Sequence, residues 1–221
     1  MITLALDAST YAGSVALLHG TSVLEAERVA MREAEHERLM PAVAAVLDRS
    51  GVDRKAIERV VCGRGPGSFT SLRIAAGIAK GLATGIPCAL FDVSSLALLV
   101  AAAPVGKGRY LGALDALRGE CYVGLYEVAP DAQVRELERP RLLPIASLGS
   151  LAVECSARVV TPMSGPEWIE ANPDAAALAR CATLLADAEP VDLRSWQPEY
   201  GRLAEAQVRW ESAHGRPLAD A

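Results

Sequence analysis

The segment from Cys62 to Gly85 constrains the fold of this chain more than any other. An apolar run ends at Val61, and the residues that follow alternate glycine with other types: Gly63, Arg64, Gly65, Pro66 and Gly67. Glycine adopts backbone conformations that a side chain disfavours, and proline favours turns. The segment therefore predicts the end of a strand, a tight glycine turn and a helix.

The helix after the glycine turn is unusually thin. Hydroxyl side chains at its start, on Ser68, Thr70 and Ser71, are candidate N-caps because they accept hydrogen bonds from unpaired amides. Its middle is built from alanine and glycine, and a glycine inside a helix costs roughly 0.5–1 kcal/mol relative to alanine. Gly77 and Gly81 therefore predict that another backbone approaches this helix closely.

Two interpretations of the glycine turn are open. Amides at a helix N-terminus form an anion-binding site, so the turn could hold a phosphate; alternatively, it is only a close-packed connection. The turn is not a P-loop, because no Lys-Ser or Lys-Thr pair follows its last glycine. It is not a dinucleotide-binding Gly-x-Gly-x-x-Gly loop either, because Phe69 and Thr70 stand where a third glycine would be.

Composition excludes several classes of protein. The 221 residues carry a net charge of −5, which is not the footprint of a chain that holds nucleic acid by itself. The five cysteines are widely spaced, which predicts reduced, buried thiols rather than disulfides or a zinc site. No apolar run approaches the roughly 20 residues that span a bilayer. Met1 leads directly into a strand, so we expect a cytoplasmic protein without a signal peptide.

Hydrophobic periodicity predicts an α/β protein that begins with a three-stranded antiparallel meander. Ser94 or Ser95 should cap the third helix, and Pro41 means that the first helix either begins near this residue or bends there. In the first half we expect strands at 2–6, 14–18, 22–28, 59–62 and 88–92, and helices at 33–49, 68–83 and 96–103.

The second half repeats this order of elements without a residue-level repeat. The chain should therefore divide into an N-terminal lobe, residues 1–105, and a smaller C-terminal lobe, residues 106–221. An aromatic tail with Trp196, Tyr200 and Trp210 should dock onto this chain or onto a partner. We expect strands at 110–114, 121–128, 134–139 and 159–160, and helices at 147–154, 175–187 and 202–210.

An aspartate ends the first strand of each half, and polar residues follow it. A carboxylate with hydroxyl groups at a strand end can hold a magnesium-solvated phosphate. The same residue types also cap hairpins, so both interpretations are open. The candidates for contacting a nucleotide or phosphate are Asp7, Ser9, Thr10, Ser14, Asp115 and Arg118.

Several stretches resemble the bacterial TsaB family, whose members are glycoprotease-like partners in the threonylcarbamoyl-adenosine modification of tRNA. The most specific stretch is G-R-G-P-G-S-F-T-S-L-R at 63–73, and others lie at 4–17, 35–47, 92–103 and 113–127. The resemblance is close over residues 1–127. It implies an actin/Hsp70/sugar-kinase-like fold of two RNase H-like lobes, with mixed sheets flanked by helices.

The resemblance also implies a function. TsaB-like chains are non-catalytic partners of their paralogue TsaD, which works with the ATPase TsaE to place a threonylcarbamoyl group on the adenosine beside the tRNA anticodon. TsaD carries its metal on a His-x-x-x-His pair after the strand that matches residues 88–92, where this chain has no histidine. We therefore expect no catalysis, metal or cofactor of its own. The assembled complex could bind ATP or ADP, a nucleotide could sit between the two aspartate turns, and tRNA would be contacted only through the complex.

The helices at 33–49 and 68–83 are expected to bind TsaD, with TsaE completing a ternary complex. The same surface should pair with a second copy, giving a homodimer when the chain is alone. The alternative is that Gly77 and Gly81 pack on the chain's own sheet. The predicted interface residues are His36, Leu39, Met40, Val43, Phe69, Leu72, Arg73, Ala76, Gly77 and Lys80.

Two other classes of function are alternatives. An actin-fold ATPase or small-molecule kinase would depend on Asp7, although no catalytic base is evident for it. A metallopeptidase would need a bound metal, and the chain contains neither a His-Glu-x-x-His nor a Gly-x-Ser-x-Gly motif.

Overall fold

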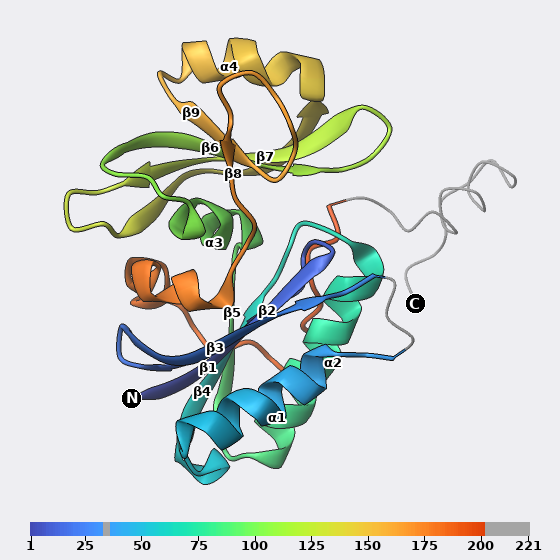
Figure 1. Cartoon of the computed structure of the whole chain (residues 1–221), viewed down its shortest axis with the longest axis vertical. Coiled ribbons are helices and arrows are strands. Elements are labelled where there is room, and N and C mark those ends of the chain that lie inside the picture. The colour runs from blue at the N-terminus through green and yellow to red at the C-terminus, as the bar shows by residue number, and fades with distance from the viewer. Residues whose placement is uncertain (33–35, 202–221) are drawn as a thin grey trace, which may run out of the picture.

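The computed structural model describes residues 1–32 and 36–201, which form two five-stranded sheets. In Figure 1 the sheets lie one above the other, and helices separate and flank them. Helix α4 (Leu148–Glu154) covers the upper sheet, α3 (Ser95–Ala102) lies between the sheets, and α1 (Leu39–Ser50) and α2 (Phe69–Gly85) cover the lower one. The layers therefore alternate between helix and sheet.

The first sheet joins the predicted N-terminal meander to two parallel strands. Its strands are β1 (Ile2–Asp7), β2 (Ala12–His19), β3 (Ser22–Ala30), β4 (Ile57–Gly63) and β5 (Ala89–Val93). They lie in the order β3-β2-β1-β4-β5. The meander is antiparallel, whereas β4 runs parallel to both β1 and β5. A short 3-10 helix, η1 (Arg54–Ala56), leads into β4.

The second sheet has the same topology. Its strands are β6 (Gly108–Asp115), β7 (Glu120–Val128), β8 (Val134–Pro144), β9 (Arg158–Thr161) and β10 (Ile169–Glu170), in the order β10-β9-β6-β7-β8. Strands β6, β7 and β8 form an antiparallel meander, and β9 pairs in parallel with β6 and β10. The duplication of a meander followed by parallel strands confirms the predicted fold class.

Three apolar layers hold the sheets and helices together. The central layer lies between the two sheets, and α3 supplies much of it because nearly every residue of this helix is buried. A second layer lies between the first sheet and helices α1 and α2. A third lies between the second sheet and α4. Because the first sheet is covered on both faces, β1 and β2 read as nearly continuous apolar runs rather than alternating ones.

Helix α1 begins later than the predicted helix at 33–49. Regular helix starts at Leu39, and residues 33–35 lie outside the described part of the chain. The Glu37 carboxylate accepts a hydrogen bond from the amide of Met40 at 3.1 Å, which satisfies one of the unpaired donors at this end. Pro41 falls in the first turn, where its missing N–H costs nothing. The helix therefore begins near the proline.

The predicted helix at 175–187 is instead two short helices, η3 (Ala175–Arg180) and α5 (Ala182–Leu185). The break has a tertiary cause. The guanidinium of Arg180 donates hydrogen bonds to the carbonyls of Ala101, Ala103, Val105 and Ala132, at 2.6–3.2 Å. These contacts fix the chain at Arg180 against the end of α3, and the buried Cys181 follows with a non-helical backbone.

Other predicted boundaries shift, and three short elements, η1, β10 and a 3-10 helix that follows β8, were not predicted. Strand β8 continues to Pro144 instead of ending at 139, with irregular pairing opposite Val123–Tyr126. A short 3-10 helix, η2 (Ile145–Ser147), follows it, and β10 was not expected. The helix predicted at 202–210, with Trp210, lies outside the described residues. No helix within the described residues is both long and apolar enough to span a bilayer.

The two sheets lie on either side of residue 105, but the chain then returns to the first sheet. Helix η3 packs between the sheets, where the Ala175 amide donates to Ser14 Oγ at 2.9 Å. Farther on, the Val191 amide donates to the Leu90 carbonyl at 2.8 Å. Residue 105 therefore separates the strands of the two sheets along the chain. Residues 174–200 follow the second sheet in the chain but contact both lobes.

Candidate functional site

Residues 63–67, the glycine turn, pack closely against the first turn and against the end of the described chain near Glu199. A Cβ atom added to Gly63 would collide with the Asp7 carboxylate, and one added to Gly67 would collide with the backbone of Ser9. A Cβ on Gly65 would lie 2.6 Å from the Glu199 carbonyl oxygen. Glycine is required at these positions because other backbone and side-chain atoms occupy the space.

The amides of this turn are engaged within the protein. The Arg64 amide donates to the Val93 carbonyl at 2.9 Å, the Gly65 amide to Ser95 Oγ at 3.0 Å, and the Ser68 amide to the Ser9 carbonyl at 2.7 Å. These donors would otherwise be available for an anion. Packing therefore accounts for these three amides, and phosphate binding at the start of α2 stays a prediction.

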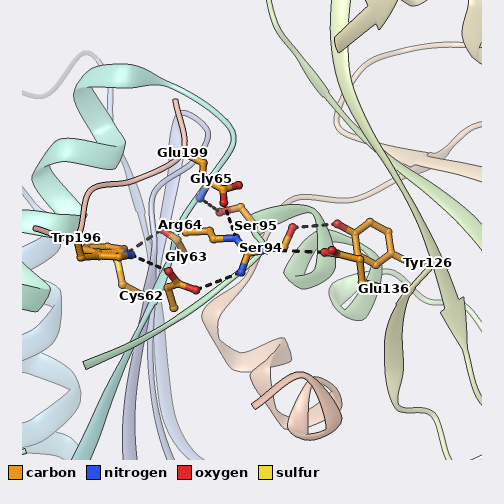
Figure 2. Close-up of polar contacts among 11 residues, drawn as sticks. Cys62, Gly63, Arg64, Gly65, Ser94, Ser95, Tyr126, Glu136, Trp196 and Glu199 are labelled. Carbon is orange, nitrogen blue, oxygen red and sulfur yellow. Dashed lines mark hydrogen bonds and ion pairs between the residues drawn. The ribbon is translucent and has the colours of Figure 1, made fainter. Parts of the chain in front are cut away.

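The hydroxyl groups expected to cap helices bind other side chains. Ser68 Oγ lies 3.1 Å from Ser71 Oγ, and neither forms a side-chain cap at the start of α2. Ser94 Oγ pairs with Tyr126 Oη across the two lobes at 2.9 Å (Figure 2). Ser95 Oγ donates to Asp7 Oδ2 at 2.5 Å. Ser68 and Ser94 therefore stand at the predicted N-cap positions of α2 and α3, but neither side chain makes a capping hydrogen bond. The hydroxyls of Ser94 and Ser95 are buried and bind partners from other segments instead.

Asp7 is fully buried at the end of β1. Its Oδ1 accepts hydrogen bonds from the Ser9 amide at 2.9 Å and from Ser9 Oγ at 2.7 Å, and Ser95 holds its Oδ2. Desolvation raises the pKa of the Asp7 carboxyl, and the hydrogen bonds from Ser95 and Ser9 oppose that rise. The carboxylate thus joins the first turn to the start of α3.

Replacing Asp7 with asparagine should remove a pH dependence of stability. Because the folded pKa of Asp7 lies above its unfolded value, wild-type protein should lose stability relative to Asp7→Asn as pH rises through the folded pKa. Above that pH the difference should become constant. Urea unfolding at pH 4–8 measures it, with exposed Asp187→Asn as control. A difference that does not vary over this range would contradict the burial of an ionising carboxyl.

The other predicted phosphate contacts lie in the two equivalent turns. Thr10 Oγ1 bonds to the backbone of Ala12, and Ser14 Oγ accepts from the Ala175 amide. Asp115 Oδ1 accepts from the Leu117 amide at 2.7 Å, within the turn that also contains Arg118. The structure brings the four residues of the first turn together in one lobe and places Asp115 and Arg118 in the other. Their role toward a nucleotide stays a prediction.

A cavity of about 440 Å³ opens between the lobes, but none of the predicted phosphate contacts lines it. Arg28, the cation in its wall, is held by Asp174, whose Oδ2 lies 2.7 Å from Arg28 Nε. Within residues 1–32 and 36–201, no three His, Cys, Asp or Glu side chains are grouped so that they could hold a metal ion. The lining residues are Ala12, Gly13, Arg28, Ala102, Pro104, Glu170, Ala171, Asn172 and Pro173.

The predicted interface residues divide into two groups. Leu39, Val43, Leu72 and Ala76 point into the chain's own interior, since each is at most 6% exposed, and their assignment to an outward surface is corrected. The periodicity of a helix identifies an apolar face, and in both helices that face covers the first sheet. The remaining residues are exposed or half-buried: His36, Met40, Phe69, Arg73, Gly77 and Lys80.

Gly77 and Gly81 lie on the outer side of α2. Both are exposed, and a Cβ atom added to either would meet nothing within 4 Å. The alternative that they pack on the chain's own sheet is therefore wrong. Met40 and Phe69, which are 42% and 37% exposed, are large apolar side chains of the same two helices. We call this outward surface of α1 and α2, with Met40, Phe69, Gly77 and Gly81, the helix face.

The sequence did not predict the contacts of Arg64, and it left open whether the aromatic tail docks onto this chain or onto a partner. The Arg64 guanidinium lies 3.1 Å from an Asp92 oxygen, and Trp196 Nε1 donates to the other Asp92 oxygen at 2.7 Å (Figure 2). The ring of Tyr200 lies 4.6 Å from that of Phe69. The tail aromatics Trp196 and Tyr200 thus dock onto this chain. The glycine–arginine–glycine sequence was the available signal, because a long cation in a close-packed turn needs partners nearby.

The duplicated topology, with helices between and outside two equivalent sheets, defines the class of actin/Hsp70/sugar-kinase-like proteins. Residues 29–148 match a family model described as TsaD, tRNA N6-adenosine threonylcarbamoyltransferase. The chain belongs to the TsaB family: it is 31% identical to the tRNA threonylcarbamoyladenosine biosynthesis protein TsaB of Bacillus subtilis, over 95% of this chain and 98% of that one.

Other relatives agree with this assignment. The TsaB protein of Escherichia coli is 40% identical over 58% of this chain and 55% of its own length. Among solved structures, YeaZ from Pseudomonas aeruginosa superposes with a TM-score of 0.72 at 31% identity, covering 90% of this chain and 99% of that one. The similarity thus extends over the second lobe, where the sequence resemblance is loose.

Proposed function

We propose that this chain acts in threonylcarbamoyl-adenosine biosynthesis as a non-catalytic partner of TsaD, with TsaE completing the complex. Membership of the TsaB family supports the process, and the helix face supports the mode of action. The main evidence for this mode of action is that Gly77 and Gly81 leave the outer side of α2 open. A bare glycine ridge lets a helix of another chain approach closely, and the exposed Met40 of α1 and Phe69 of α2 are further apolar side chains that a partner could contact.

The further assignments follow from this role. We propose that the chain has no cofactor of its own, that ATP or ADP is held only by the assembled complex, and that tRNA is contacted through that complex. The same helix face would pair two copies when TsaD is absent, so that homodimer and heterodimer exclude one another. A chain that works on tRNA with these partners belongs in the cytoplasm.

Gly77→Leu should weaken binding to a TsaD homologue by tenfold or more, which corresponds to about 1.4 kcal/mol. The leucine would hold the partner helix away from the ridge, while helix α2 itself should be retained because leucine favours helix more than glycine does. Binding is measured by titration with purified TsaD from the same source. Ala76→Arg is unsuitable for this test, because Ala76 is buried.

Gly149→Leu is the matched control, because Gly149 is also an exposed helical glycine with open space around it, on α4 of the other lobe. It should bind TsaD like the wild type. If Gly77→Leu bound TsaD as tightly as this control, the helix face would not be the docking surface. An ATPase activity of the purified chain that is lost in Asp7→Asn would instead support the kinase or ATPase alternative.

A further inference from the structure

Residues 190–200, here called the strap, run back across the first lobe after η3 and α5. The Val191 amide bonds to the Leu90 carbonyl of β5, and the Glu199 amide donates to the Arg64 carbonyl at 2.7 Å. Pro198, between them, is buried. The strap is thus fixed along the edge of the first sheet from β5 to the glycine turn.

The end of the strap reaches the second sheet. Tyr122 Oη, on β7, donates a hydrogen bond to the Tyr200 carbonyl at 3.1 Å. A Cβ atom added to Gly201, which has a positive φ of 68°, would collide with the Tyr122 ring. One short segment therefore contacts both lobes, although the two sheets share no strand.

The Arg64 side chain contacts both lobes and the strap (Figure 2). Its guanidinium lies 3.1 Å from Asp92 of β5, 3.4 Å from Glu199 of the strap and 3.9 Å from Glu136 of β8. The side chain is only 24% exposed, and its buried Nε makes no hydrogen bond because the contact to Glu199 is poorly aligned. A cation held in this way is stable only while its carboxylates stay in place.

The strap also contacts the helix face. The Tyr200 ring lies against Phe69, and the Lys80 ammonium lies 5.7 Å from the centre of the Trp196 ring. Both Phe69 and Lys80 belong to α2, whose outer side carries Gly77. The strap therefore touches the helix that the proposed partner would bind.

We infer that the strap and Arg64 form a clasp that holds the two lobes in one relative orientation and transmits that orientation to the helix face. The inference rests on the proposed function for the identity of the partner, but not for the clasp itself. A partner bound to α2 would then stabilise the clasp and, through Glu136, strand β8 of the second lobe. Because such coupling is reciprocal, loosening β8 would weaken binding at α2.

Hydrogen exchange of the full chain tests the clasp without any partner. Arg64→Met keeps an unbranched apolar stem and removes the guanidinium group, and it should raise exchange of residues 190–200 and of β8 around Glu136 by about tenfold. Exchange in β1 and β2 should stay at the wild-type level. Arg49→Met is the control, since Arg49 pairs with Glu25 and Glu27 within the first lobe only. Faster exchange in the strap alone, or in neither segment, would overturn the clasp.

Glu136→Gln keeps the test decisive if Arg64→Met does not fold. This variant removes the carboxylate by which Arg64 reaches the second sheet, while Asp92 and Glu199 still face the guanidinium. It should raise exchange in β8 while the strap stays protected. If β8 of Glu136→Gln exchanged at the same rate as in the wild type, Arg64 would not hold the second lobe.

Adding the TsaD homologue separates the clasp from the proposed function. In wild-type protein, binding should protect both α2 and β8, whereas in Glu136→Gln it should protect α2 alone and be weaker. Protection of α2 alone in the wild type would overturn the coupling while leaving the partner role standing. If the TsaD homologue did not bind, the proposed function would be contradicted. The exchange measured without a partner would still show whether the clasp exists.

Discussion

Gly67→Ala should destabilise the protein by about 3 kcal/mol, at the upper end for overpacking of a closed site. The added methyl group would collide with the carbonyl group and Cα of Ser9, which are backbone atoms of the first turn. Neither side can yield easily, because the Ser68 amide bonds to that same carbonyl at 2.7 Å. Urea unfolding should show a lower midpoint at an unchanged slope, and thermal unfolding a decrease of about 6–12 °C.

Gly81→Ala is the matched control for this substitution. Gly81 is also a glycine of the Cys62–Gly85 segment, but it lies in the middle of α2 with nothing within 4 Å of an added Cβ. Alanine there should stabilise the protein by roughly 0.5–1 kcal/mol. If both variants had wild-type stability, the close approach of the glycine turn to the first turn would not be a constraint of the fold.

Arg180→Ala should cost about 3 kcal/mol of stability. The four carbonyls that Arg180 contacts include those of Ala101 and Ala103, at the end of α3, where backbone acceptors have no partner within the helix. A hydrogen bond to a charged group contributes about 1.5–3 kcal/mol. Removal of the side chain would take this donor from the part-buried carbonyls of Ala101, Ala103 and Val105, of which Ala103 keeps a bond from the Val105 amide. The loss is measured by urea unfolding, and faster hydrogen exchange should appear at the end of α3.

Two further variants test whether the loss of stability is specific to the guanidinium group at position 180. Arg180→Lys should recover only part of the stability, because an ammonium group lacks the planar fork that reaches several carbonyls at once. Arg54→Ala removes an exposed arginine from η1 and should change stability by less than about 0.5 kcal/mol. If Arg180→Ala were as mild as Arg54→Ala, the cap on α3 would contribute nothing measurable.

Local patterns were sufficient for the order of elements. Apolar runs that end at Asp7 and Asp115, with polar turns after them, predicted both hairpins. The alternation of Gly63, Gly65 and Gly67 predicted the turn into α2. Such signals are readable because turns and strand ends depend on the residues that form them. The duplicated topology followed from the repeated order of these elements.

The interface and the site were predicted less well, for a common reason. In α2, small residues occur on every side, so the sequence did not distinguish buried Ala76 from exposed Gly77. The hydroxyls of Ser94 and Ser95 have the right spacing for caps, but Tyr126 and Asp7 bind them instead. These partners are 32 and 88 residues away in the chain. Their proximity is a property of the packed molecule.

The sequence by itself determined the two meanders, the strands at 59–62, 88–92 and 159–160 and the thin helix after the glycine turn, because each depends on the conformational preferences of consecutive residues. Only the tertiary structure decided which side of α2 faces outward, how η3 breaks at Arg180, and that the tail returns to bind Arg64. These features depend on which distant groups compete for the same donors and the same buried space, and no local preference specifies that competition.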